Sequence, residues 1–255
     1  MATLQDIFGL KGRRALITGS TRGIGAAIAE GLAGAGAHVV VHGTGENAAM
    51  AAAESIRSLG GLADPIALDL SVPGAGKRLI DDAEALAGPI DILVVNASAQ
   101  VNAHLADLTA DDLDFQLSVN LKSTVNMLQA VLPRMAERRW GRVVSIGSIN
   151  QISPKPVVTA YAATKAAQHN IIQSQAREYA QTGVVLNTLA PGLIDTDRNA
   201  ARKNADPEGW ANYCSTVNWM GRAGQSREMV GAAIFLASDA CSFMTGETLV
   251  LSGGL

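Results

Sequence analysis

The sequence predicts an α/β fold: a doubly wound parallel sheet of seven strands with helices on both faces. Short apolar runs alternate with longer Ala-rich segments almost to the end of the 255-residue chain. Most of these runs are continuously apolar, which is typical of strands covered on both faces. Regular alternation of strand and helix indicates parallel strands joined by crossover helices. The expected strands are residues 13–18, 38–42, 65–70, 91–96, 142–148, 184–190 and 247–253, and the expected helices are 23–35, 46–59, 74–87, 109–137, 160–181 and 226–238.

The chain is expected to form a single domain, because 255 residues suit one α/β domain and no repeat or linker interrupts them. Residues 191–225 break the rhythm, since they are long and polar yet contain three aromatic side chains and Met220. Long insertions in compact domains are usually lids or binding loops. We therefore expect a substrate lid at 191–225, with a surface helix pair of no function as the alternative.

Composition excludes several classes of protein. The formal net charge is −3 and no basic block suggests nucleic acid. The N-terminus lacks a signal-peptide pattern, and no apolar stretch is long enough to span a bilayer. Cys214 and Cys241 stand far apart and are expected to be unpaired thiols. These features predict a cytoplasmic protein that binds a small molecule, without a metal and without nucleic-acid or membrane partners.

The stretch "TGSTRGIG" (18–25) follows the first expected strand and opens the first helix. Its three glycines allow a tight turn, close approach of a pyrophosphate and close packing of helix on strand. The N–H groups at the start of the helix face the same phosphates. The residues expected to bind the cofactor here are Gly19, Thr21, Gly23, Ile24 and Gly25.

The end of the second strand favours NADP over NAD. A site for an unphosphorylated ribose usually places an Asp or Glu there, but this chain has Gly43 and Thr44. Arg22, inside the glycine turn, is suited to pair with a 2′-phosphate; a solvated turn residue is its alternative role. Thr44, and His42 as a weaker candidate, would add hydrogen bonds.

Two more strand ends are expected to border the cofactor. Asp69 ends the third expected strand and would accept a hydrogen bond from the adenine amino group, with Leu70 beside it. Asn96 and Ala97, in "NASA" (96–99), would flank the same crevice at the end of the fourth strand.

Tyr161 and Lys165 stand four residues apart in an expected helix, and so on one face. An ammonium group stabilises a nearby phenolate, which would let Tyr161 exchange a proton with a carbonyl or hydroxyl oxygen during hydride transfer. Ser148 would polarise that oxygen by hydrogen bonding; Ser145, inside the strand, is a less accessible rival. The side chain of Asn120, or a local bend, would bind a water linking Lys165 to solvent, unless Asn120 is an ordinary polar helix residue.

Together these motifs, with "APGLIDT" (190–196), resemble the short-chain dehydrogenases/reductases of the NADP-preferring, one-domain Rossmann type. The resemblance covers about residues 10–254. It implies that Asn120, Ser148, Tyr161 and Lys165 form a catalytic tetrad, that Tyr161 and Lys165 also contact the cofactor, and that the protein is a homotetramer with helices 109–137 and 160–181 at one interface. It assigns four residues to the nicotinamide end: Pro191, Gly192, Ile194 and Thr196.

Two departures from the family pattern affect the cofactor end. Ser98 stands where the family usually has a glycine. If that position needs the backbone freedom of glycine, the serine alters the loop next to the cofactor. The C-terminal "LSGGL" lacks a frequent Val-Asp pair before its glycines.

The predicted function is NADP(H)-dependent interconversion of a carbonyl and a secondary alcohol. Similarity to the gluconate 5-dehydrogenase kind favours a small sugar-acid or polyol-like substrate. A 3-oxoacyl-[acyl-carrier-protein] reductase is the alternative, and it would need an exposed basic patch; a noncatalytic NADP-binding sensor or scaffold is the alternative of another class. Lid residues Trp210, Tyr213, Asn218 and Trp219 would contact the substrate or serve only packing. The candidate patch consists of Arg134, Arg138, Arg139 and Arg142, which also suit a solvated helix C-terminus.

Overall fold

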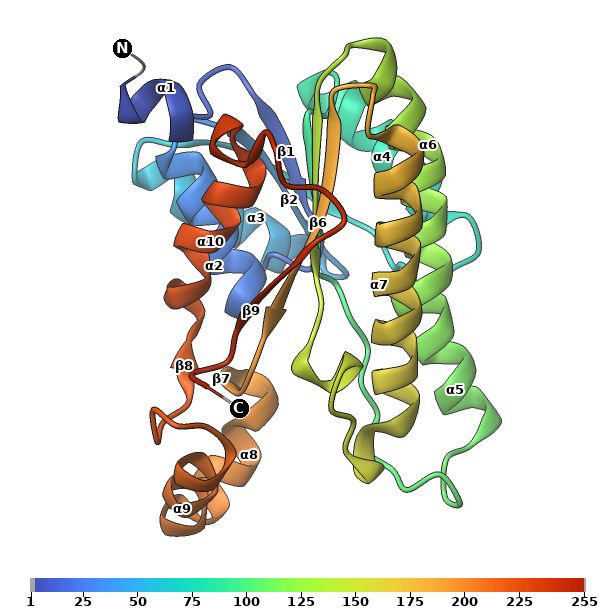
Figure 1. The fold of residues 1–255 in the computed structure, drawn as a ribbon, viewed down its shortest axis with the longest axis vertical. Coiled ribbons are helices and arrows are strands. Elements are labelled where there is room, and N and C mark those ends of the chain that lie inside the picture. The colour runs from blue at the N-terminus through green and yellow to red at the C-terminus, as the bar shows by residue number, and fades with distance from the viewer. Residues whose placement is uncertain (1–2, 255) are drawn as a thin grey trace.

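A computed structural model describes residues 3–254 of the chain. Seven parallel strands form its main sheet, in the order β3-β2-β1-β4-β5-β6-β9 (Figure 1), which confirms the predicted fold class. The chain order reverses between β1 and β4, and in open parallel sheets that point is where ligands bind. The strands are β1 (Arg14–Ile17), β2 (His38–Gly43), β3 (Leu62–Ala67), β4 (Ile92–Val95), β5 (Gly141–Ile146), β6 (Val184–Pro191) and β9 (Thr248–Leu251).

Helices cover both faces of the sheet (Figure 1). Leu16 and Ile17 of β1 are fully buried and belong to separate apolar cores, one on each face. The strand therefore has no polar side, which explains its continuous apolar run. One face is covered by α2 (Gly23–Gly34), α3 (Glu46–Ser58) and α10 (Val230–Ala237), and the other by α4 (Ala75–Ala87), α6 (Ser123–Glu137) and α7 (Thr159–Tyr179).

Three predicted elements differ from the structure. The third strand lies at Leu62–Ala67, not 65–70, because an edge strand tolerates the missing N–H of Pro65. The expected helix 109–137 is divided into α5 (Ala110–Leu117), a π-helical turn (Ser118–Lys122) and α6. The fifth strand ends at Ile146, two residues before Ser148.

The lid segment, residues 191–225, folds as two helices and a small two-stranded sheet. The sheet pairs β7 (Ile194–Asp195) with β8 (Gly224–Gln225), and α8 (Asp197–Ala205) and α9 (Pro207–Val217) lie between them in sequence. In Figure 1, α8 and α9 lie beyond the carboxyl ends of the strands. A short N-terminal helix, α1 (Leu4–Phe8), precedes β1, and no helix within residues 3–254 has the length and apolarity of a membrane span.

Candidate functional site

A cavity of about 1100 Å³ lies where the carboxyl ends of the strands meet the lid segment. Every residue predicted to bind the cofactor lines it, as do Ser148, Tyr161 and Lys165, while Asn120 lies behind its wall. The fold therefore brings the glycine turn and the predicted catalytic residues into one cavity. Residues 3–254 contain no group of three or more His, Cys, Asp or Glu side chains arranged to hold a metal ion.

The glycine turn is shaped by its contact with the end of β4. Gly19 and Gly23 have φ values of +62° and +59°, which only glycine adopts without strain. A Cβ on Gly25 would collide with the amide of Asn96, which itself donates 2.9 Å hydrogen bonds to the carbonyls of Thr18 and Gly19. No side chain caps the start of α2, so its first N–H groups suit the phosphates of a dinucleotide.

Arg22 and Thr44 lie exposed at the adenosine end of this cavity. The Arg22 guanidinium is 3.8 Å from the Asp197 carboxylate, and both side chains are largely exposed. Such a pair contributes little free energy, so it does not prevent Arg22 from engaging a 2′-phosphate. A Cβ on Gly43 would lie 2.5 Å from Cγ2 of Thr21, so a glycine at position 43 lets the glycine turn pack against the end of β2.

His42 supports the turn and is not a phosphate ligand. Its buried ring accepts a hydrogen bond from the Gly19 amide at Nδ1 (3.0 Å), and its Nε2 lies 2.9 Å from the Leu68 carbonyl. Burial lowers the pKa of His42, which favours the neutral ring donating from Nε2. Asp69 lies two residues beyond β3 and accepts a 2.8 Å hydrogen bond from the amide of Ser71.

Tyr161 and Lys165 lie one turn apart on α7 and are almost completely buried. The Lys165 ammonium donates to the Ile146 carbonyl (2.7 Å) and to Oε1 of Gln168 (2.9 Å). Burial, and secondarily the charge of Arg198, lowers the pKa of Lys165 to about 7. The positive charge beside Tyr161 is therefore sensitive to pH near neutrality.

Ser148 is the N-cap of a short 3₁₀ turn, Ile149–Gln151. Its hydroxyl oxygen accepts from the amide of Asn150 (3.1 Å) and from Asn150 Nδ2 (3.3 Å). Because both contacts are donors, the hydroxyl proton of Ser148 remains for an acceptor in the cavity. Ser145 lies inside β5, buried and away from the cavity lining.

Asn120 holds the wall of the cavity together. Its Oδ1 accepts from the Ala99 amide (2.7 Å), and its Nδ2 donates to the Ala99 carbonyl (2.8 Å) and to Oγ1 of Thr164 (2.9 Å). Its own carbonyl accepts from Gln168, the residue that also contacts Lys165. Both polar atoms of the side chain thus contact protein groups, and the π-helical turn Ser118–Lys122 is the local bend expected as the alternative. The water link to Lys165 stays a prediction.

Ser98 does not need the backbone freedom of glycine. Within residues 3–254, Arg139 is the only non-glycine residue with a positive φ. The Ser98 hydroxyl instead accepts from Nη2 of Arg198 (3.1 Å), and Gln100 Oε1 accepts from Nη1 (2.9 Å). The sequence analysis did not predict a role for Arg198. The one signal in the sequence was its contact partner Ser98, which stands where the family usually has glycine.

Of the four lid residues considered, only Tyr213 lines the cavity. Its hydroxyl accepts from Lys155 Nζ (2.5 Å), and the Arg202 guanidinium lies 3.8 Å from its ring centre. Trp210 is buried, and Trp219 is 84% exposed outside this cavity. The Asn218 amide donates to the carbonyl of Arg222.

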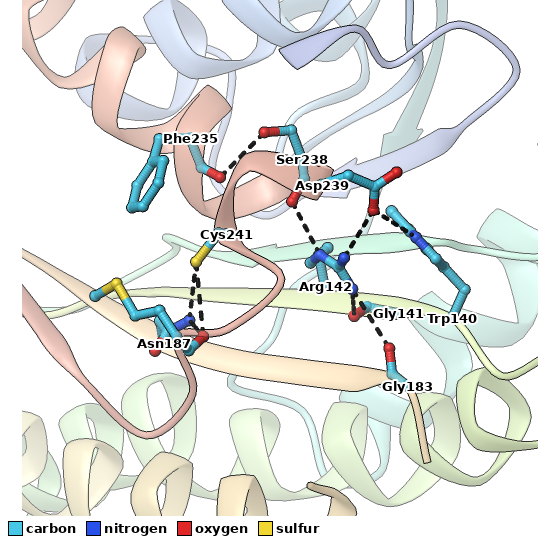
Figure 2. Close-up of polar contacts among 10 residues, drawn as sticks. Trp140, Gly141, Arg142, Gly183, Asn187, Phe235, Ser238, Asp239 and Cys241 are labelled. Carbon is cyan, nitrogen blue, oxygen red and sulfur yellow. Dashed lines mark hydrogen bonds and ion pairs between the residues drawn. The ribbon is translucent and has the colours of Figure 1, made fainter. Parts of the chain in front are cut away.

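The four arginines between 134 and 142 do not form an exposed basic patch. Arg142 is buried, and its side chain lies between β5 and the turn after α10 (Figure 2), where it contacts the Ser238 carbonyl (3.1 Å) and the Asp239 carboxylate (2.9 Å). Arg134 pairs with two acidic residues of α4, and Arg138 donates to the carbonyl of Ile90. Arg138 and Arg139 are exposed and have no ion pair within residues 3–254, so two of the four charges remain at the surface.

A model of the short chain dehydrogenase family matches residues 13–207. The chain belongs to the short-chain dehydrogenase family. It is 37% identical over 253 residues to gluconate 5-dehydrogenase of Gluconobacter oxydans, covering 98% of this chain and 97% of that one. This membership makes the protein an oxidoreductase and confirms the resemblance on which the predicted reaction rested.

Two solved structures of short-chain dehydrogenases are close to this one. A 3-oxoacyl (acyl-carrier-protein) reductase of Agrobacterium tumefaciens C58, with NADP bound, is 67% identical with a TM-score of 0.97. The match covers 99% of this chain and 98% of that one. A gluconate 5-dehydrogenase of Burkholderia cenocepacia, in complex with NADP and tartrate, is 40% identical with a TM-score of 0.92 and the same coverage.

Proposed function

We propose that this short-chain dehydrogenase uses NADP(H) to interconvert a carbonyl and a secondary alcohol on a small sugar acid. The observation that carries the proposal is the single cavity, which joins the glycine turn and Arg22 to Ser148, Tyr161 and Lys165. The cofactor expected from Arg22 and the absent acid agrees with the two relatives solved with NADP. When bound, the reduced nicotinamide supplies the hydride that converts the carbonyl carbon to an alcohol carbon.

The protein's own residues hold the substrate oxygen and move one proton. Ser148 donates its hydroxyl proton as a hydrogen bond to the substrate carbonyl, because its oxygen already accepts two bonds from Asn150. Tyr161 gives its phenolic proton to the same oxygen as it becomes a hydroxyl. The Lys165 ammonium, held by Ile146 and Gln168, stabilises the phenolate left behind. In the oxidative direction each proton movement is reversed.

The remainder of the cavity lining is mixed: Phe115, Val157 and Val217 are apolar, and other side chains suit a polar substrate. Amide, hydroxyl and cationic side chains border the space next to Tyr161. A relative named gluconate 5-dehydrogenase binds tartrate, a hydroxy acid of similar polarity. The polar side chains concerned are Gln100, Asn102, Asn150, Lys155, Arg198 and Tyr213.

Replacing Tyr161 by Phe tests the proposed chemistry. The variant keeps the ring but has no proton to donate, so we expect NADPH-dependent reduction of 5-ketogluconate to fall by about 10²–10⁴-fold. NADPH consumption measures the rate, and Tyr179→Phe, near the far end of α7 and outside the cavity, is the matched control. Equal rates for Tyr161→Phe and the wild type would favour the noncatalytic alternative.

A 3-oxoacyl-[acyl-carrier-protein] reductase is the second candidate, favoured by the 67% identical relative of that name. The ion pairs of Arg134 and Arg142 reduce the predicted basic patch for an acidic carrier protein to Arg138 and Arg139. Acetoacetyl thioester and 5-ketogluconate, compared at equal concentrations, separate the two. We expect a higher kcat/KM for the keto acid, and the opposite order would support the carrier-protein reaction.

We also propose a homotetramer, as the family resemblance implies, with α5–α6 and α7 at one interface. Leu113 and Phe115 of α5 are large apolar side chains exposed in the single chain, which suits a surface covered by another copy. Light scattering coupled to size-exclusion chromatography measures the mass of the particle in solution, and the mass of a monomer would refute the assembly.

A further inference from the structure

We propose that Arg198 selects an anionic substrate by binding a carboxylate of the molecule whose carbonyl lies at Tyr161. This inference rests on the proposed function and narrows it from a sugar acid or polyol to the acid. Arg198 lies in the first turn of α8 and lines the same cavity as Tyr161. Its Cζ atom is 5.7 Å from the centre of the Tyr161 ring.

The charge of Arg198 is not neutralised by any side chain within residues 3–254. Its hydrogen-bond acceptors are the hydroxyl and carbonyl of Ser98 and the side-chain carbonyl of Gln100, all uncharged. Within residues 3–254 it has no ion pair, whereas Lys203 on the same helix pairs with Asp195 at 2.6 Å. A cation held in place by neutral groups is suited to bind an anion from solution.

The contacts to Ser98 and Gln100 fix the direction of the guanidinium. Gln100 is itself oriented, because its Nε2 donates to Asn102 (2.7 Å) while its Oε1 accepts from Arg198. Ser98 belongs to the loop after β4, and a glycine there would lack the hydroxyl acceptor. The serine that departs from the family pattern therefore positions Arg198 at the substrate end of the cavity.

The cavity's other charges divide it into two ends. Lys155 and Arg202 both lie near Tyr213, at 4.9 Å and 3.8 Å from the centre of its ring, and neither has an ion pair within residues 3–254. The carboxylates that line the cavity are Asp69, beyond β3, and Asp197, which faces Arg22. The end next to Tyr161 thus combines several cations with no acidic side chain, which favours a negatively charged ligand.

The electrostatic field of Arg198 reaches the proposed catalytic group. After burial, the charge of Arg198 is the second cause of the lowered pKa of Lys165. A bound carboxylate would offset this repulsion and so favour the ammonium form beside Tyr161. Binding of the anion and readiness for proton transfer would then be linked through one residue.

The kinetic test compares an anionic and a neutral ketone of similar size, 5-ketogluconate and L-sorbose, with NADPH. For Arg198→Gln we expect KM for the keto acid to rise on the order of 10- to 100-fold, because a charge-assisted contact is lost. We expect kcat/KM for sorbose to change far less, and only through the effect of the Arg198 charge on Lys165. Arg198→Lys should retain part of the affinity, Ser98→Gly should lose part of it, and Lys203→Gln is the matched control on α8. An equal loss for both ketones, or no change in KM, would overturn the proposal.

A binding test keeps the inference separate from the reaction. Tartrate and threitol have the same four-carbon chain, charged in one and neutral in the other, and each is added to the NADP⁺-loaded protein in a thermal-shift assay. We expect tartrate to raise Tm in the wild type and not in Arg198→Gln, and threitol to have no effect in either. If tartrate binding depends on Arg198 but no ketone is reduced, the anion site stands and the proposed function fails. Equal tartrate shifts in both proteins, or none in the wild type, would refute the anion site.

Discussion

At the scale of single residues, the site is controlled by the partners that each functional group already has. Ser148 accepts two hydrogen bonds from Asn150, so its proton is available to substrate. Both polar atoms of the Asn120 side chain contact Ala99 or Thr164, so this residue positions the loop after β4 against α7. Lys165 is buried, which makes its charged form costly in the folded protein and lowers its pKa.

Lys165 should make stability depend on pH in a predictable direction. Its pKa is about 7 in the folded chain against 10.5 for the ordinary side chain. Between these values the unfolded chain binds a proton that the folded chain does not, so the free energy of unfolding rises with pH. Relative to Lys165→Met, the wild type should therefore become more stable from pH 7 to 10.

Chemical denaturation at several pH values measures this effect. A matched control is Lys11→Met, at an exposed lysine, which should follow the wild type. Parallel curves for the wild type and Lys165→Met would contradict the lowered pKa.

At the scale of secondary structure, short irregular elements build the site and regular ones support it. The π-helical turn Ser118–Lys122 turns Asn120 toward the loop after β4, and the 3₁₀ turn after β5 carries Ser148. At the opposite end of the sheet, the first residues of β5 attach the turn after α10. There Arg142 contacts Ser238 and Asp239, and Trp140 donates to the same carboxylate (Figure 2).

Arg142→Leu should destabilise the fold without changing the site. The substitution removes the side-chain donor to the buried carbonyl of Ser238, which then keeps only the amide of Cys241, and losing a buried hydrogen bond from a charged group costs about 1.5–3 kcal/mol. Asp239→Asn keeps an acceptor oxygen at a side chain that is 53% exposed, so it should cost less than about 1 kcal/mol. Urea denaturation gives both values, and similar losses for the two variants would refute this account.

At the scale of the whole molecule, the sheet order brings distant segments to one cavity. Ser98 and Arg198 are 100 positions apart in the chain. They meet because the parallel strands β4 and β6 have their carboxyl ends on the same side of the sheet. The lid segment completes this edge, with α8 supplying Arg198 to the substrate end and Asp197 to the cofactor end. Cofactor and substrate are thus bordered by adjacent residues of one helix.

Cofactor preference should depend on Arg22. A ligand that binds only the folded chain raises Tm according to its concentration and affinity, so NADPH should produce a larger thermal shift than NADH. Arg22→Ala should remove this difference, while Asp197→Asn, which removes the facing carboxylate, should preserve or increase it. An equal or larger shift with NADH in the wild type would contradict the assignment.

Much of the fold and the site follows from the sequence because it depends on local patterns. Continuous apolar runs gave six of the seven strands at nearly their observed positions, and the glycine turn and the Tyr161–Lys165 pair depend on spacings of a few residues. The third strand was misplaced because its ends are decided by pairing with β2 at the sheet edge. The π-helical turn was missed because its cause, the contacts of Asn120 with Ala99 and Thr164, is not local.

By itself the sequence determined the α/β class, the family and the residues that would carry the chemistry, since each is written in composition or in short spacing. Only the tertiary structure decided which polar groups remain available. It engaged His42 and Arg142 internally and, in the part of the chain that the structure describes, gave Arg198 no acidic partner. It also explained Ser98 as a support for that arginine and not a strained substitute for glycine. Hydrogen-bond partners and unpaired charges depend on contacts between residues far apart in the chain, and no local pattern encodes them.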